Sequence, residues 1–139
     1  MLELAVLERE EYERVERKIR IQAGDVTATA TLNDSATADA IWKALPIEAR
    51  ANTWGDEIYF AIPVKLPEES GQEIVQVGDV AYWPPGSAFC IFFGPTPMSR
   101  GTEIRPASAV NVVGRIVDDP LGFRRVASGA RVAIEPVQS

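Results

Sequence analysis

The sequence contains no histidine and only one cysteine, Cys90. Without histidine, the chain cannot form a Ser-His-Asp or Cys-His catalytic pair, a histidine-ligated metal site or the usual general base near neutral pH. A single cysteine excludes an intramolecular disulfide and any zinc site that needs several thiolates. We therefore expect neither a metal site nor a cofactor.

Positive charge is also scarce, with 14 Lys and Arg against 20 Asp and Glu and a formal net charge of −6. An acidic domain repels phosphate backbones, so we expect no nucleic-acid partner. No apolar run approaches the ~20 residues of a membrane span, so we expect no membrane partner. The chain does not open on a basic stretch followed by an apolar one, as a secretory signal would. These absences predict a cytoplasmic protein, and a single free thiol is compatible with that compartment.

The 139 residues are 46% hydrophobic and 24% charged, which is sufficient for one globular domain with one core. Residues 1–17 differ from the rest because they are rich in alternating charges. The pairs Glu10–Arg14 and Glu13–Arg17 have the i,i+4 spacing at which opposite charges meet on a helix. We interpret residues 1–17 as a charged extension, helical or solvated, with a strand over 2–7 as the alternative. The domain itself then spans residues 18–139.

The first part of the domain predicts a hairpin followed by a helix. Apolar and polar residues alternate from 19 to 32 around Gly24-Asp25, which is typical of two strands joined by a tight turn. Asn33-Asp34-Ser35 supplies helix-capping side chains, residues 36–45 place their apolar residues on one face, and Pro46 ends the pattern.

After Pro46 the chain is rich in short strands separated by Pro and Gly turns. We expect strands at 57–64, 73–77, 80–83, 87–93, 110–117 and 131–134. Seven or eight strands with one helix, and no repeated βαβ unit, favour a mainly β fold. Closure into a barrel is the economical way to remove free strand edges.

Three segments resemble a known family. They are NTWGDEIYF at 52–60, VGDVAYWPPG at 77–86, and FFGPTPMS at 92–99 together with PASAVN at 106–111. Over about residues 18–135 the chain is similar to the small prokaryotic cyclophilin-like proteins, a family of uncharacterised β-barrels. The resemblance implies a closed eight-stranded barrel with one short helix capping an open end. A shared fold does not imply a shared activity.

The resemblance also implies that the cyclophilin catalytic set is missing. The run from Gly86 to Ile91 is similar to the cyclophilin strand Gly-Ser-Gln-Phe-Phe-Ile, so Ala88 occupies the Gln position and Cys90 the pocket Phe position. Val110 stands where the pocket His would be. The strand that corresponds to the one with the catalytic Arg, roughly 56–63, contains no Arg.

Four candidate site residues lie at or near strand ends. Trp54 precedes a strand, and Trp83 precedes Pro84-Pro85, so each either plugs the barrel or lies on a ligand face. Glu57 and Tyr59 share one face of their strand, opposite the apolar residues that would fill the barrel. A carboxylate beside a phenol either binds a ligand or moves a proton, or it is an ordinary solvated pair.

Cys90 and Phe92 share one face of the next apolar strand, while Phe89, Ile91 and Phe93 share the other and would fill the core. A buried free cysteine usually behaves as a small hydrophobe. A nucleophilic role for Cys90 would require an Arg or a helix N-terminus nearby, because no histidine can activate it.

The long loop that follows combines Pro with Thr96 and Met98, which suits the rim of a binding site or a simple barrel closure. Arg100 and Arg105 flank this loop and are natural anchors for a carboxylate or a phosphate, or ordinary solvated side chains. Asn111 is polar within a β-branched strand, and we expect it to hydrogen-bond a neighbouring loop backbone.

Three functional hypotheses follow. The first is a domain that binds a small anionic molecule or a peptide in a surface groove, without cyclophilin-type catalysis. The second is a weak peptidyl-prolyl isomerase with Arg105 recruited from the loop, and the third is a module linked to amide hydrolysis through Glu57 or Cys90. The sequence is compatible with a homo-oligomer. The candidate ligand-binding residues are Trp54, Glu57, Tyr59, Trp83, Cys90, Phe92, Thr96, Met98, Arg105 and Asn111.

Overall fold

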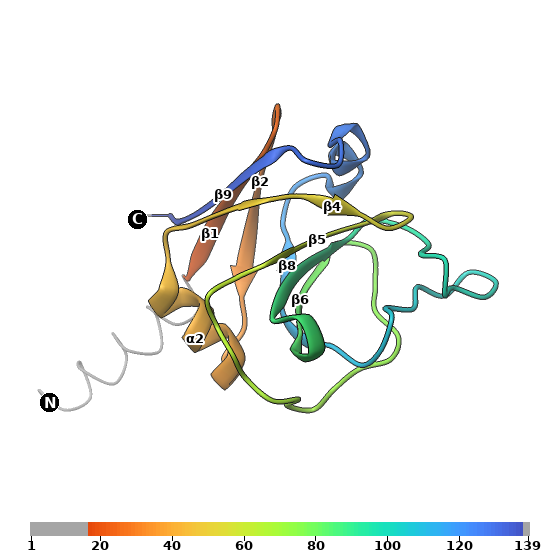
Figure 1. The fold of residues 1–139 in the computed structure, drawn as a ribbon, viewed down its shortest axis with the longest axis horizontal. Coiled ribbons are helices and arrows are strands. Elements are labelled where there is room, and N and C mark those ends of the chain that lie inside the picture. Colours follow the sequence, from red (N-terminus) through yellow and green to blue (C-terminus); the bar gives the residue numbers. More distant parts are fainter. Residues whose placement is uncertain (1–16, 138–139) are drawn as a thin grey trace, which may run out of the picture.

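The computed structural model describes residues 17–137, so the interpretation of residues 1–16 as a helix, strand or extension lies outside it. Within the described range the chain forms one antiparallel sheet of nine strands and one α-helix (Figure 1). No helix in residues 17–137 is long and apolar enough to cross a membrane. The strands are β1 (Lys18–Ala23), β2 (Val26–Leu32), β3 (Ile47–Arg50), β4 (Asn52–Thr53), β5 (Glu57–Ala61), β6 (Asp79–Trp83), β7 (Ala88–Phe92), β8 (Asn111–Ile116) and β9 (Arg131–Pro136).

The two edge strands of the sheet are consecutive in the chain, and this connection closes the sheet into a barrel. Its strand order is β3-β9-β1-β2-β8-β6-β7-β5-β4, so β3 and β4 are at opposite ends. Only Ala51 separates these two strands in sequence, and its N–H donates to the carbonyl of Ala130 at 2.9 Å. The predicted mainly β barrel is confirmed. It has nine strands rather than eight because the segment that closes it is divided at Ala51.

Two parts of the strand prediction were wrong. The strands β3 and β4 were not expected, since they are short and pair only with distant segments. The expected strand at 73–77 is instead a loop with two isolated bridges, Gln72 to Val110 and Val75 to Ile104. Its alternation has a different cause: Val75 is buried beneath the loop that faces it, whereas Ile74 and Val77 are exposed.

The interior of the barrel is filled by alternate residues of its strands. On β5 and β7 these are Ile58, Phe60, Phe89 and Ile91, all of them buried. The rings of Phe60 and Phe89 stack with their centroids 5.5 Å apart. The predicted division of these strands into an inward apolar face and an outward face is therefore confirmed.

Short helices close the two ends of the barrel. The predicted helix is α2 (Ala36–Ala44), and it begins at Ser35, whose side chain accepts from the N–H of Ala38 at 3.1 Å. Ala38 and Ile41 join the core at this end. At the far end of β2 lies the 3₁₀ helix η2 (Pro120–Arg125). It contributes Phe123, which contacts Phe93 with ring centroids 6.2 Å apart.

The outward face of β5, β6 and β7 is also covered. A second apolar cluster forms there, between these strands and the loops that precede β6 and β8. Every residue of β7 is buried, because one face lies against the barrel core and the other against this cluster. The buried members of the cluster are Val75, Ala81, Ala88, Cys90, Phe92, Ile104 and Val110.

Gly114 lies where the backbone of a neighbouring strand leaves no room for a side chain. It lies on β8 between Leu32 of β2 and Val80 of β6, and a Cβ at this position would overlap the carbonyl of Thr31. Since overpacking in a rigid interior costs about 1–3 kcal/mol, Gly114→Ala should lower the free energy of unfolding by about that amount, measured by urea denaturation. Gly122→Ala is the control, because its Cβ would make only ordinary contact with Val26 at 3.6 Å. Equal stability of the two variants would contradict this account of β8.

Candidate functional site

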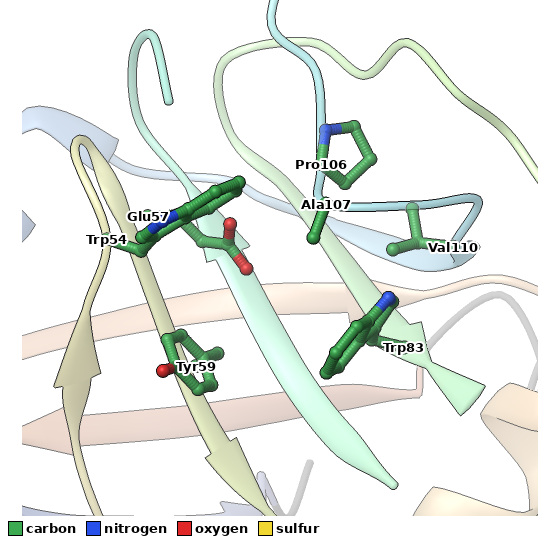
Figure 2. A pocket seen from close by; sticks show the side chains of 7 residues that line it. All are labelled: Trp54, Glu57, Tyr59, Trp83, Pro106, Ala107 and Val110. Carbon is green, nitrogen blue, oxygen red and sulfur yellow. The ribbon is translucent and has the colours of Figure 1, made fainter. Parts of the chain in front are cut away.

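A pocket of about 280 Å³ opens on the outer face of the barrel (Figure 2). Glu57 and Tyr59 come from β5, Trp54 from the turn that precedes it, and Trp83 from the end of β6. The loop that leads into β8 supplies the opposite wall. The pocket is lined by Trp54, Glu57, Tyr59, Trp83, Pro106, Ala107 and Val110.

The turn that carries Trp54 is fixed by two contacts. The N–H of Trp54 donates to the carbonyl of Glu57 at 2.9 Å, which closes the turn between β4 and β5. Gly55 in this turn has a φ of 61°, and a Cβ there would come within 2.9 Å of the carbonyl oxygen of Pro95. Glycine therefore allows the turn to pack closely against the loop that follows β7.

Trp83 begins the segment WPPG, and two contacts fix the position of its side chain. Its indole Nε1–H donates to Oγ of Ser108 at 2.7 Å, which ties the loop before β8 to the end of β6. The ring also lies against Gly86 in the 3₁₀ helix η1 (Pro84–Gly86), where a Cβ would come within 2.7 Å of it. The position of this ring is thus set by both of its neighbours.

Glu57 is the unusual residue of the pocket. Its residue surface is 5% exposed, and its Oε1 atom is buried without a hydrogen-bond partner. Figure 2 shows its carboxyl group in the space between Trp54 and Trp83. Burial raises the pKa of Glu57 to about 7, and contact with the thiol of Cys90 offsets part of this effect. Buried carboxyls with a strongly raised pKa are enriched at functional sites.

Cys90 and Phe92 lie beneath the pocket rather than in its lining. Both belong to the second apolar cluster, and Cys90 is fully enclosed. Burial raises the pKa of the Cys90 thiol well above its ordinary value, and the neighbouring charge of Glu57 raises it further. Because the thiolate is the nucleophilic form, this environment opposes a nucleophilic role for Cys90.

Three residues predicted at the rim of the site make their contacts within the loop that follows β7. Thr96 is buried, donates from Oγ1 to the carbonyl of Arg105 and accepts on Oγ1 from the N–H of Met98 at 3.2 Å. The Met98 side chain is exposed. The Arg105 guanidinium pairs with Glu103 at 2.9 Å. None of these three side chains lines the pocket.

Asn111 also lies outside the pocket. As the sequence predicted, it hydrogen-bonds a loop backbone: its Oδ1 accepts from the N–H of Glu69 at 2.7 Å and its Nδ2 donates to the carbonyl of Pro67 at 3.1 Å. The Nδ2 also lies 3.2 Å from Oγ1 of Thr37 on α2. Asn111 therefore joins β8 to the helix and to this loop.

The structure thus gathers Trp54, Glu57, Tyr59 and Trp83 around one space. Pro106, Ala107 and Val110 were not among the predicted site residues. Pro106 and Ala107 carry no polar group that would have marked them. Val110 was marked only by the family resemblance, as the position of the cyclophilin pocket His. Among residues 17–137, no three Cys, Asp or Glu side chains gather in a way that could hold a metal ion.

Residues 17–135 match the family described as cyclophilin-like, and the chain belongs to that family. The fold is similar to the solution structure of the hypothetical protein AF2241 from Archaeoglobus fulgidus, with 46% identity and a TM-score of 0.75. That comparison covers 87% of this chain and 95% of AF2241. No curated protein matches the chain.

A structure of McbB in complex with tryptophan shares the fold alone, at 16% identity and a TM-score of 0.65. That comparison covers 84% of this chain and 44% of McbB. Within this chain, the positions that the resemblance assigns to the cyclophilin Gln, Phe and His are Ala88, Cys90 and Val110. All three lie in the second apolar cluster. By this resemblance, Ala88 and Val110 put apolar side chains where a cyclophilin has hydrogen-bonding ones, and Cys90 puts a small thiol where it has an aromatic ring.

The raised pKa of Glu57 predicts a pH-dependent stability difference. Between its ordinary pKa of 4.5 and about 7, the folded protein holds a proton on Glu57 that the unfolded chain releases, so this group favours unfolding increasingly as pH rises. In Glu57→Gln this contribution is absent. The stability of the variant relative to wild type should rise by up to about 3 kcal/mol from pH 4.5 to pH 8 and then level off.

Urea denaturation of both proteins across this pH range measures the difference. The raised pKa of Asp79, which also results mainly from burial, is common to both proteins and cancels. Parallel stability curves for wild type and Glu57→Gln would show that the carboxyl is solvated in the folded protein.

Proposed function

We propose that the protein is a binding domain that holds a small molecule or a peptide segment in the pocket between Trp54 and Trp83, without cyclophilin-type catalysis. The supporting observation is a pocket of about 280 Å³ with aromatic walls and one buried carboxyl. Ligand sites are typically concave and mostly apolar, with a few polar groups that orient the ligand. The net charge of −6 disfavours a nucleic acid as the partner.

The lining disfavours the small anion that the sequence also suggested. Arg105, the expected anion anchor, pairs with Glu103 and lies outside the pocket lining. The carboxyl group in the lining, that of Glu57, would repel an anion once it is ionised. A peptide segment or a neutral or positively charged small molecule suits these surroundings better.

The lining also disfavours the alternative of a weak prolyl isomerase. The resemblance assigns Ala88, Cys90 and Val110 to the positions of a cyclophilin Gln, Phe and His, and these side chains supply neither an amide nor an imidazole donor there. We expect a protease-coupled assay on a proline peptide to give the uncatalysed rate at micromolar protein. A rate that rises in proportion to protein concentration would overturn this expectation. For the amide-hydrolysis alternative, the enclosed thiol of Cys90 leaves Glu57 as the one candidate group.

Binding can be tested by NMR through the indole N–H signals. We expect millimolar indole, or a blocked Ala-Pro-Ala peptide, to shift the signals of Trp54 and Trp83. Trp42 is an internal control, since it lies on α2 beside Arg17 and away from the pocket.

The variant Ala107→Trp should abolish these shifts, because Ala107 is exposed and lines the pocket, so a large ring there fills it. Thr102→Trp is the matched control, since Thr102 is exposed on the same loop and does not line the pocket. Shifts that persist in Ala107→Trp, or that neither probe produces, would contradict the proposal.

A further inference from the structure

We infer that the pocket selects an organic cation of the alkylammonium class, with Trp54, Tyr59 and Trp83 as aromatic walls and Glu57 as the counter-ion. This inference rests on the proposed function and names the chemical class of its ligand. Two independent features of the pocket support it. Several aromatic side chains form its wall, and its carboxyl group is buried without a positively charged partner.

The aromatic side chains come from three places in the fold and meet at one space. Trp54 is on the turn before β5, Tyr59 is on β5, and Trp83 ends β6. Figure 2 shows the two indoles on either side of the Glu57 carboxyl, with the ring of Tyr59 lying along the same strand. Aromatic rings attract cations through the negative potential of their faces, and several rings around one space recognise quaternary or methylated ammonium groups.

The carboxyl group of Glu57 has no positively charged partner among the described residues; its contact is with the thiol of Cys90. With 5% of its surface exposed and Oε1 without a hydrogen bond, it would be an uncompensated buried charge when ionised. Buried charges in proteins are normally paired, because an unpaired one is costly. A bound ammonium group would supply the missing positive charge.

The chain supplies no competing cation among the described residues that line the pocket. The nearby Arg105 pairs with Glu103 at 2.9 Å, and Arg115 pairs with Asp79 at 2.9 Å. The Trp83 N–H is already donated to Ser108, so it does not call for an acceptor on the ligand. The net charge of −6 would also favour the approach of a cation over that of an anion.

The test compares two probes of nearly equal shape and different charge. Choline carries a trimethylammonium group, and 3,3-dimethyl-1-butanol carries a neutral tert-butyl group in its place. In NMR titrations at pH 8, where Glu57 is mostly ionised, choline should bind at least tenfold more tightly than the alcohol. Both should shift the indole signals of Trp54 and Trp83 and leave that of Trp42 unchanged.

Two variants separate the contributions of charge and aromatic surface. Glu57→Gln keeps the shape of the side chain and should remove most of the choline preference while the alcohol still binds. Trp54→Leu keeps an apolar side chain and should reduce the choline preference in the same way, so the test does not depend on one variant. Glu48→Gln, an exposed residue on β3, is the charge-matched control and should retain the preference.

Each outcome bears on the inference. Equal affinities for the two probes in the wild-type protein, or a choline preference that survives in Glu57→Gln, would overturn it. If indole or the proline peptide binds in the pocket and choline does not, the inference fails while the proposed function stands. If no probe shifts Trp54 and Trp83, both fail.

Discussion

The structure depends on how strands β5 and β7 are buried: β7 is buried on both faces along its whole length, and β5 at its first two residues, Glu57 and Ile58. Their inward side chains, such as Phe60 and Phe89, stack within the barrel, and the outward side chain of Cys90 packs beneath the loops before β6 and β8. Outward positions in this region are therefore also removed from water. Glu57 occupies one of them, which is why its carboxyl group is removed from water although it faces away from the barrel core.

The covering of the outer face of these strands also determines the surroundings of the pocket. The loop before β8 covers part of the outer face and is fastened by the hydrogen bond from Trp83 to Ser108, leaving a space over Glu57. A scaffold that belongs to the cyclophilin-like family thus carries an aromatic, acidic pocket over the apolar cluster that contains Ala88 and Val110, the positions that the resemblance assigns to the cyclophilin Gln and His. The family fold supplies the location, and the side chains of this chain determine the chemistry.

Much of this could be predicted from the sequence, because alternation of side chains along a strand is a local property. This alternation placed Glu57 and Tyr59 on one face of β5 and identified the inward residues of β7. The closing segment around Ala51 could not be predicted, since β3 and β4 are defined by pairing with distant strands. The pocket wall at Ala107 and the pairing of Arg105 with Glu103 depend on the path of a long loop, which no local pattern encodes.

The most direct test is a ¹³C NMR titration of the Glu57 side-chain carboxyl in the protein without ligand. We predict a midpoint near pH 7, because burial raises the pKa of Glu57 to about that value. We also predict that saturating choline moves the midpoint to lower pH, since a bound cation stabilises the carboxylate. A midpoint near the ordinary value of 4.5 in the free protein would contradict this, because burial would then not disfavour the ionised carboxyl and no bound cation would be needed to compensate its charge.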